Sequence, residues 1–118
     1  MSEPTLFERI AQGDIPADIV YQDDRVTAFH DIAPQAPVHI LVVPNRAIAT
    51  VHDAQPGDEA LLGHLLLTAG AIARDLGLDT SGYRLIVNNG PDAGQEVFHL
   101  HVHILAGRAL GPIVQPPG

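Results

Sequence analysis

Hydrophobic and polar residues recur with different periods along the chain, and these periods predict the elements of the fold. Thr5 followed three positions later by Glu8 is a capping-box pattern, and the residues behind it have an apolar side, which predicts a short helix near residues 5–12. Ile19–Tyr21 and Arg25–Phe29 are separated by three polar residues, a pattern typical of a β-hairpin. The N-terminal region therefore predicts a helix followed by two paired strands.

The central region predicts one buried strand and one long helix. Val38–Val43 is β-branched and almost continuously apolar, as expected for a strand covered on both faces, and Pro44 ends it. From about Pro56 to Leu76 apolar residues recur at helical spacing, with Gly77 in place as a C-terminal stop. We expect this segment to be the main helix.

The C-terminal region predicts two more strands, at Tyr83–Asn88 and Phe98–Leu105, with the polar turn Asn89–Gly94 between them. The tail from Gly107 is rich in Gly and Pro.

Helices interspersed among hairpin-connected strands favour an α+β fold with a mostly antiparallel, five-stranded sheet and the long helix packed on one face. With 118 residues and 46% hydrophobic content, the chain has room for one core, so we expect a single domain over residues 1–118.

The charge of the chain restricts its partners. The formal net charge is −8, and all six cationic residues are arginines, which opposes broad attraction to a nucleic-acid backbone. Because there is no lysine and no GxxxxGKS/T pattern, a P-loop is excluded, and any phosphate must be held by other donors.

The absence of cysteine excludes a disulfide framework, a thiol nucleophile and Cys-based zinc sites. The first ten residues do not resemble a secretory signal, since they already contain Glu3, Pro4 and Glu8, and no apolar run approaches the length of a membrane span. We expect a soluble cytoplasmic protein that binds neither nucleic acid nor membrane.

The segment His99-Leu100-His101-Val102-His103 is the strongest candidate for chemistry. Side chains alternate between the faces of a strand, so the three histidines project from one face and the apolar residues from the other. Three imidazoles are costly to bury without partners, and an exposed strand face more commonly carries Thr, Lys, Glu or Arg. A functional role is therefore favoured over an exposed polar face on an edge strand.

Two chemistries suit three alternating histidines. Near neutral pH a neutral imidazole can attack phosphorus, while an adjacent protonated imidazole can neutralise phosphate oxygens or protonate a leaving group. Alternatively, three neutral imidazoles can coordinate Zn²⁺ and leave a fourth position for water. Neighbouring ligands on one strand have Cα atoms about 6.5–7 Å apart, so the outermost pair would be strained to share one ion. We rank the metal site second.

The histidine segment and its surroundings resemble the motif of the histidine triad (HIT) family, in which histidines alternate with apolar residues. The matching segments cover nearly the whole chain: Tyr21–Arg25, Ala28–Ile32, Pro34–Pro37, His39–Pro44, Asn88, Gly94–Val97 and His99–Leu105. Within the family, the Hint-type nucleoside phosphoramidases are most similar. Glu96 and Gly107–Pro112 look more like bacterial members, and the tail has no tryptophan.

The resemblance implies a HIT-like fold and a homodimer that binds a purine nucleotide. It also implies hydrolysis of the P–N bond of adenosine 5′-phosphoramidates through a nucleotidyl-histidine intermediate, which releases AMP and an amine without metal or cofactor. By matching positions, His101 would be the nucleophile and His103 a phosphate contact. His99 would position the site through its backbone, and His39 would support the triad.

The same resemblance implies a set of nucleotide-binding residues. Asp31 and Ile32 would meet the ribose and the base, while Asn88 and the backbone of Gly94, Gln95 and Glu96 would surround the phosphate. An Asp can accept two hydroxyl hydrogen bonds, and an Asn can donate to a phosphoryl oxygen. A carboxylate at Glu96 would repel a phosphate unless its side chain points away or is protonated.

Two other functions remain open from the sequence: a hydrolase of dinucleoside polyphosphates and a non-catalytic nucleotide-binding scaffold. The physiological amine, the effect of the tail Pro112–Gly118 and the cellular role are not encoded in any motif. We interpret the remaining histidines, His30, His52 and His64, as structural or surface residues.

Overall fold

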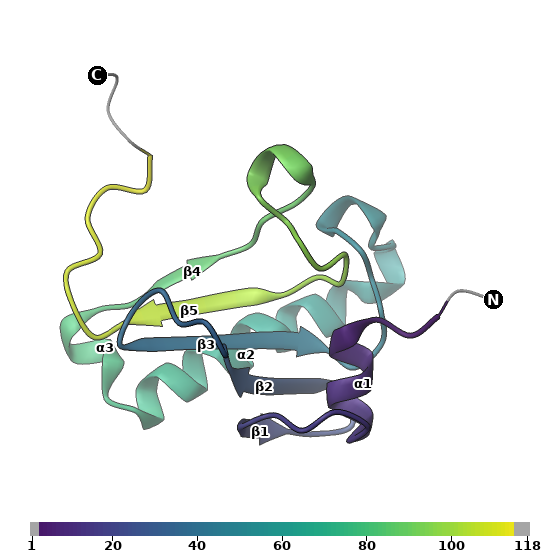
Figure 1. Cartoon of the computed structure of the whole chain (residues 1–118), viewed down its shortest axis with the longest axis horizontal. Helices are drawn as coiled ribbons and strands as arrows, with labels where there is room; N and C mark the ends of the chain where they lie inside the picture. The colour runs from purple at the N-terminus through teal and green to yellow at the C-terminus, as the bar shows by residue number, and fades with distance from the viewer. Residues whose placement is uncertain (1–2, 115–118) are drawn as a thin grey trace.

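The computed structural model describes residues 3–114, which form an α+β fold around one antiparallel sheet (Figure 1). The sheet has five strands in the order β1-β2-β3-β5-β4, and every neighbouring pair is antiparallel. The predicted α+β class and five-stranded sheet are therefore confirmed. The strands are β1 (Ile19–Gln22), β2 (Val26–His30), β3 (Val38–Pro44), β4 (Arg84–Ile86) and β5 (Val102–Ala106).

Helices lie on both faces of the sheet: in Figure 1, α1 lies in front of it and α2 runs behind it. The bounds are α1 (Leu6–Gln12), α2 (Glu59–Asp75) and α3 (Leu78–Ser81), with short 3₁₀ turns at Val51–Asp53, Pro56–Asp58 and Pro91–Ala93. The predicted helices near 5–12 and from Pro56 to Leu76 are thus confirmed, the second with a 3₁₀ first turn. No helix among residues 3–114 is long and apolar enough to cross a membrane.

Two hydrophobic clusters fill the space between the sheet and its helices. Ile40 and Val42 of β3 pack with the α2 side, whereas Leu41 and Val43 pack with the side that carries Phe7 and Ile10 of α1. Every residue of β3 from His39 to Pro44 is buried, as predicted for a strand covered on both faces. The central strand therefore has one face in each core, and the α1 face is the one that includes His39.

The first helix is fixed at its N-terminus by the predicted capping box. The Thr5 hydroxyl accepts a hydrogen bond from the Glu8 backbone N–H (3.0 Å), and the Glu8 carboxylate accepts one from the Thr5 N–H (2.9 Å). Gly13 ends the helix in the left-handed conformation (φ 82°). This short helix is therefore anchored at both ends.

The last two strands are shorter than predicted. β5 begins at Val102 rather than at Phe98, because the N–H of Leu100 donates to Ile48 O (2.6 Å) in the loop after β3 instead of continuing the ladder with β3. β4 covers only Arg84–Ile86 of the predicted Tyr83–Asn88, since its pairing with β5 stops at Ile86 opposite His103. The segment between β4 and β5 is thereby free to form a loop beside the histidines.

A candidate active site beside strand β5

The three histidines of the motif lie on the face of the sheet that carries α1. The residues between and after them, Leu100, Val102 and Ile104, belong to the core on the α2 side, so the predicted alternation continues even where β5 has not yet begun. His99 is fully buried and His101 is 7% exposed. An exposed polar face, the structural alternative considered from the sequence, is therefore wrong.

The His99 ring is held at both nitrogens. Its Nε2 lies 2.7 Å from the carbonyl oxygen of Pro44, and its Nδ1 lies 2.6 Å from the hydroxyl of Thr5. Because a carbonyl can only accept, Nε2 carries the proton, and Nδ1 accepts from the hydroxyl. Burial lowers the pKa of His99 and keeps the ring neutral in this arrangement.

The His101 ring is oriented by the backbone of His99. Its Nδ1 lies 2.7 Å from the carbonyl oxygen of His99, so Nδ1 carries a proton, and in the neutral ring the lone pair is on Nε2. Among residues 3–114, no protein atom hydrogen-bonds this Nε2. The Phe7 ring packs edge-on against the imidazole at a centroid distance of 5.1 Å. The ring of His101 thus has a fixed orientation, and in its neutral form Nε2 has a free lone pair.

His39 and His103 form a chain of hydrogen bonds that starts at the backbone. The Gln35 N–H donates to Nδ1 of His39 (3.0 Å), so the proton of His39 is on Nε2, which lies 2.9 Å from Nδ1 of His103. Nδ1 of His103 therefore accepts, and the neutral His103 ring carries its proton on Nε2. This series of hydrogen bonds leaves the Nε2–H of His103 available to donate to a ligand.

Burial lowers the pKa of His103 to about 4, and the nearby His101 and His39 rings also disfavour a charge there. Burial likewise lowers the pKa of His39, against the opposing effect of the Asp31 carboxylate. These shifts disfavour, at His103 near neutral pH, the protonated imidazole that three alternating histidines would allow. The neutral ring has one N–H available as a hydrogen-bond donor.

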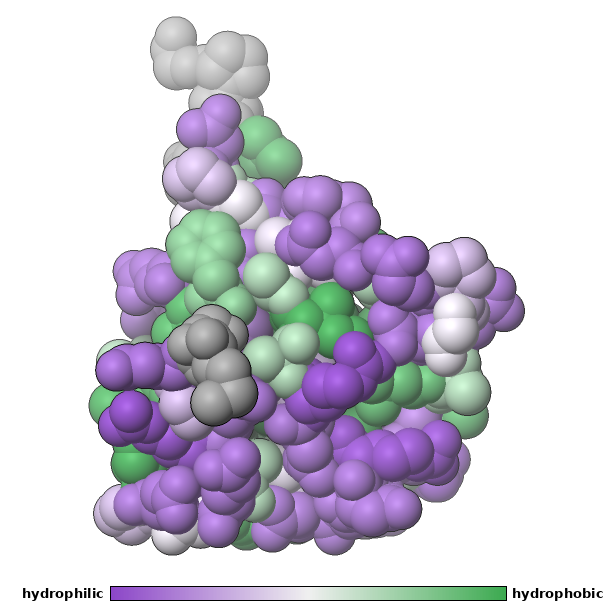
Figure 2. Space-filling model, turned by 90° about the vertical axis from the view of Figure 1, so that its right-hand side faces the viewer, coloured by the Kyte–Doolittle hydropathy of each residue, from purple (hydrophilic) through white to green (hydrophobic). Residues whose placement is uncertain are grey.

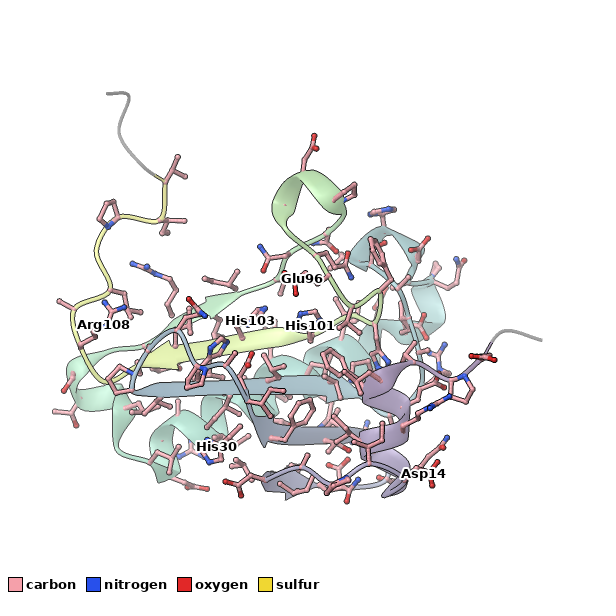
Figure 3. The ribbon with its side chains drawn as sticks, in the orientation of Figure 1. Asp14, His30, Glu96, His101, His103 and Arg108 are labelled. Carbon is pink, nitrogen blue, oxygen red and sulfur yellow. The ribbon has the colours of Figure 1, made fainter. Side chains whose placement is uncertain are left out.

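A cavity of about 430 Å³ opens beside these rings. Figure 3 shows His101, His103 and Glu96 close together on one side of β5, whereas Asp14, His30 and Arg108 lie away from them. Seven residues predicted from the sequence line the cavity, namely Asp31, His39, Asn88, Gly94, Glu96, His101 and His103, together with Phe7, Ala33, Gln35, Leu41 and Val97. Residues distant in the sequence thus meet in one place.

Comparison with known families identifies the fold and the motif. A family model described as the HIT domain matches residues 12–110. The chain belongs to the HIT domain family. An uncharacterized HIT-like protein of Synechococcus elongatus is 57% identical over 118 residues, with all of both chains covered. The purine nucleoside phosphoramidase of Escherichia coli K12 is 51% identical over 118 residues, which is 100% of this chain and 99% of that protein.

Solved HIT structures share the fold over almost their whole length. A histidine triad protein from Clostridium difficile superposes with a TM-score of 0.91 at 43% identity, covering 97% of this chain and 100% of the other. A HIT family hydrolase from Legionella pneumophila gives a TM-score of 0.88 at 45% identity, with 98% and 100% coverage. The fold and the family expected from the motif are thereby confirmed.

Three residues predicted for the HIT site do not line the cavity: Ile32, Gln95 and His99. The Ile32 side chain is 99% exposed in the loop after β2. Gln95 is buried, its side chain bonds Gly90 N, Ala49 O and Val97 O, and its backbone N–H donates to Gly90 O (3.1 Å). Gln95 therefore braces the loop rather than presenting its amide to a phosphate.

The loop before β5 has fewer free N–H groups for a phosphate than the family resemblance implied. The Gly94 N–H donates to Pro91 O (3.0 Å), and one N–H of the Asn88 side chain donates to Ala93 O (2.8 Å). Gly94 has φ 82°, a conformation that favours glycine, so its role here is to shape the turn. The Glu96 side chain lines the cavity but is exposed, so water can solvate its carboxylate.

The histidines are poorly arranged for a metal ion. Ligand atoms of Asp31, His39 and His103 lie within 4.8 Å of one another. However, Nδ1 of His39 accepts the Gln35 N–H, so its Nε2 must carry the proton and has no lone pair to donate. Both nitrogens of His99 are also occupied, which rules out the arrangement in which the three motif histidines share one zinc.

Sequence reasoning missed several residues that build the site. Phe7 lines the cavity, and Thr5 and Gln35 fix the rings of His99 and His39. The capping box and the apolar side of α1 were visible in the sequence, but nothing in the pattern showed that this helix packs on the histidines. Only the register of the folded chain brings residues so far apart into contact.

The other histidines lie outside the cavity. His30 is near Asp18 (4.0 Å) at an exposed position, His52 is exposed in a 3₁₀ turn, and His64 pairs with Asp23 (2.7 Å). The predicted tail Pro112–Gly118 lies partly outside the described residues, which end at Val114. In Figure 1 the described part of the tail runs away from the sheet.

Proposed function

We propose that this HIT protein is a nucleotide-binding hydrolase that cleaves the P–N bond of purine nucleoside 5′-phosphoramidates, those of adenosine above all, from which it releases AMP and an amine. The observation that supports the proposal is the orientation of the His101 ring, whose Nδ1–H donates to His99 O while Nε2 is left free beside a cavity that His101 lines. The phosphoramidase of Escherichia coli, 51% identical over 118 residues, supports the same substrate class. No step requires a metal or another cofactor.

In the first step, the Nε2 lone pair of His101 attacks phosphorus and forms a new N–P bond. The P–N bond to the amine breaks, and the amine nitrogen keeps the electron pair and takes a proton from solvent. The His101 ring becomes positively charged, and its Nδ1–H donates to His99 O, which stabilises that charge. The Nε2–H of His103 donates to the phosphoryl oxygens as negative charge builds up on them.

In the second step, water attacks the nucleotidyl-His101 intermediate. The oxygen–phosphorus bond forms, the N–P bond breaks with its electron pair returning to Nε2, and the water protons are released as AMP forms. The ring is again neutral, with its proton on Nδ1. Splitting one displacement into two replaces a weak nucleophile, water, by an imidazole held at the phosphorus.

For the nucleotide, we propose that Asp31 accepts hydrogen bonds from the ribose hydroxyls and that Ile32 contacts the base. Asp31 lines the cavity, and its Oδ1 already accepts the Ala33 N–H (2.8 Å), which holds the carboxylate in place. Asn88 has one side-chain N–H left for a phosphoryl oxygen. The Ile32 side chain is almost fully exposed, so a purine bound against it would cover an apolar surface.

The proposal is tested by hydrolysis of an adenosine 5′-phosphoramidate in EDTA by the native protein, His101→Ala and His30→Ala. We expect the native protein and the exposed-histidine control His30→Ala to release AMP, and His101→Ala to be slower by on the order of a thousandfold or more. If the native protein binds AMP but does not cleave the phosphoramidate, it is a nucleotide-binding scaffold and not an enzyme. If it cleaves a dinucleoside polyphosphate faster in a parallel assay, that compound and not the phosphoramidate is its substrate class.

We propose that the protein is a homodimer. β4 is an edge strand of the sheet, and apolar side chains on it and beside it are exposed by about a third: Tyr83 (38%), Leu85 (36%) and Val87 (37%). On α2, Leu66 is 55% exposed. Pairing of two β4 edges would satisfy unpaired backbone groups and cover these side chains. Light scattering that gives the mass of one chain would overturn this proposal.

We further propose that the protein acts in the cytoplasm and binds neither nucleic acid nor membrane. The formal net charge of −8 opposes binding to polyanions. The surface seen from the α1 end is largely hydrophilic, with apolar residues in small groups between polar ones (Figure 2). Cell fractionation that recovers the protein with the membranes would contradict this location.

A further inference from the structure

Thr5 contacts the candidate site although it lies 94 residues before His99 in the sequence. Its hydroxyl oxygen accepts the Glu8 N–H (3.0 Å) as the cap of α1, and the same hydroxyl lies 2.6 Å from Nδ1 of His99. A hydroxyl has one proton to donate, and here the ring nitrogen is the acceptor available for it. Thr5 therefore joins the first turn of α1 to the motif.

The direction of each hydrogen bond that links Thr5, His99 and His101 is fixed. Nε2 of His99 must donate to Pro44 O (2.7 Å), which makes Nδ1 the acceptor of the Thr5 hydroxyl. The ring of His99 is thus held between α1 and the end of β3. The carbonyl of the same residue accepts Nδ1–H of His101 (2.7 Å), the bond that exposes the nucleophilic lone pair.

We propose that Thr5 is a positioning residue for His101, acting through His99. By holding the His99 ring, the Thr5 hydroxyl holds the carbonyl that sets the tautomer and orientation of His101. The Phe7 ring in the same helix packs edge-on against His99 (5.6 Å) and His101 (5.1 Å), so α1 supports both rings. The inference deepens the proposed function, since it concerns the nucleophile of that reaction.

The capping box offers a matched control. Thr5→Val removes the hydroxyl and with it one capping bond, whereas Glu8→Ala removes the other capping bond (Thr5 N–H to Glu8 Oε1, 2.9 Å) and leaves the hydroxyl on His99. Thr5→Ser keeps both functions of the hydroxyl. If Thr5 only caps the helix, Thr5→Val and Glu8→Ala will have equal effects.

The first readout is the kinetics of phosphoramidate hydrolysis. We expect Thr5→Val to lower kcat by roughly tenfold or more with little change in KM, because a displaced nucleophile slows chemistry more than binding. Thr5→Ser should restore kcat, and Glu8→Ala should keep it within about twofold of native. An equal loss in Thr5→Val and Glu8→Ala, or no loss in Thr5→Val, would overturn the proposal.

The second readout needs no activity: ¹H–¹⁵N spectra of the imidazoles report which nitrogen of His101 is protonated. We expect the Nδ1–H form alone in the native protein, Thr5→Ser and Glu8→Ala, and a mixture of both tautomers in Thr5→Val. If Thr5→Val keeps only the Nδ1–H form, Thr5 does not position His101. A native protein that cannot cleave phosphoramidates would refute the proposed function, while these spectra would still decide the role of Thr5.

Discussion

In each histidine of the site, the hydrogen-bond partner at one ring nitrogen determines whether the other nitrogen carries a proton or a lone pair. A carbonyl partner at Nδ1 leaves His101 with a nucleophilic Nε2, whereas a ring partner at Nδ1 leaves His103 with a donating N–H. The backbone N–H of Gln35 starts the second arrangement by fixing His39. The hydrogen-bond partners therefore suit two adjacent imidazoles to the opposite roles proposed for them, nucleophile for His101 and hydrogen-bond donor for His103.

His39→Phe is predicted to impair the site by releasing His103. Without the hydrogen bond to its Nδ1, His103 can move its proton there and present a lone pair to the phosphate, which weakens charge stabilisation. We expect kcat/KM to fall by roughly a hundredfold, the cost of losing one such donor in other enzymes. The measurement is steady-state hydrolysis by folded protein. His52→Phe, at an exposed histidine, should leave kcat/KM unchanged, and an equal loss there would contradict the explanation.

The sequence predicted the motif, and the family resemblance added His39 as its supporting histidine, but neither showed which atoms these residues contact. The period of two put His99, His101 and His103 on one face without any knowledge of the fold. The contacts of His39 with His103 and of Thr5 with His99 depend on strand register and helix packing, 64 and 94 residues apart. The pattern of one segment contains no information about such distant contacts.

At the scale of elements, the site depends on a sheet with a different core on each face. Residues of β3 and β5 alternate between the α2 core and the α1 face, so packing on one face fixes the register of the histidines on the other. Ile104 is fully buried in the α2 core and follows His103 directly. The packing of the core on the α2 side therefore helps to fix the position of the histidines on the α1 side.

Ile104→Ala is predicted to lower the free energy of unfolding by about 2–4 kcal/mol, because it leaves a cavity in a core that cannot collapse fully. Ile113→Ala removes the same atoms from a side chain that is 79% exposed and should cost less than about 0.5 kcal/mol. Urea denaturation of both variants measures the difference. Similar losses at the two positions would mean that Ile104 is not part of a tightly packed core.

Element types were predictable where the apolar period was long, as in α2, or where a capping box marked a helix start, as in α1. The ends of β4 and β5 were not. The segment from Phe98 to His101 has the alternation of a strand, but Leu100 bonds to Ile48 in a distant loop instead of to β3. Alternation reports which face a side chain occupies, and it does not report which backbone the residue pairs with.

At the scale of the whole molecule, folding buries imidazoles that are neutral in the folded state. The pKa of His103 falls from 6.5 to about 4, and burial also lowers the pKa values of His39 and His99. In the unfolded chain these rings take up protons as the pH falls through about 6.5, whereas the folded protein resists protonation. Their contribution to stability is present above this pH and is lost as the pH falls towards about 4.

We therefore predict that the free energy of unfolding decreases as the pH is lowered from about 7 to about 5, a range above that in which most carboxylates titrate. Urea denaturation at several pH values measures the slope. His103→Gln, which removes the ring with the pKa of about 4, should show a shallower slope than the native protein. An identical slope in the variant would show that burial of this ring does not govern the pH dependence.

Whether His101 attacks phosphorus can be read from the mass of the protein quenched during turnover of an adenosine 5′-phosphoramidate. We predict an increase equal to one adenylyl group, located on His101 by fragmentation and absent in His101→Ala. Turnover with AMP release and no adenylyl group, on protein quenched within the first turnover, would show that water attacks phosphorus directly and that His101 is not the nucleophile.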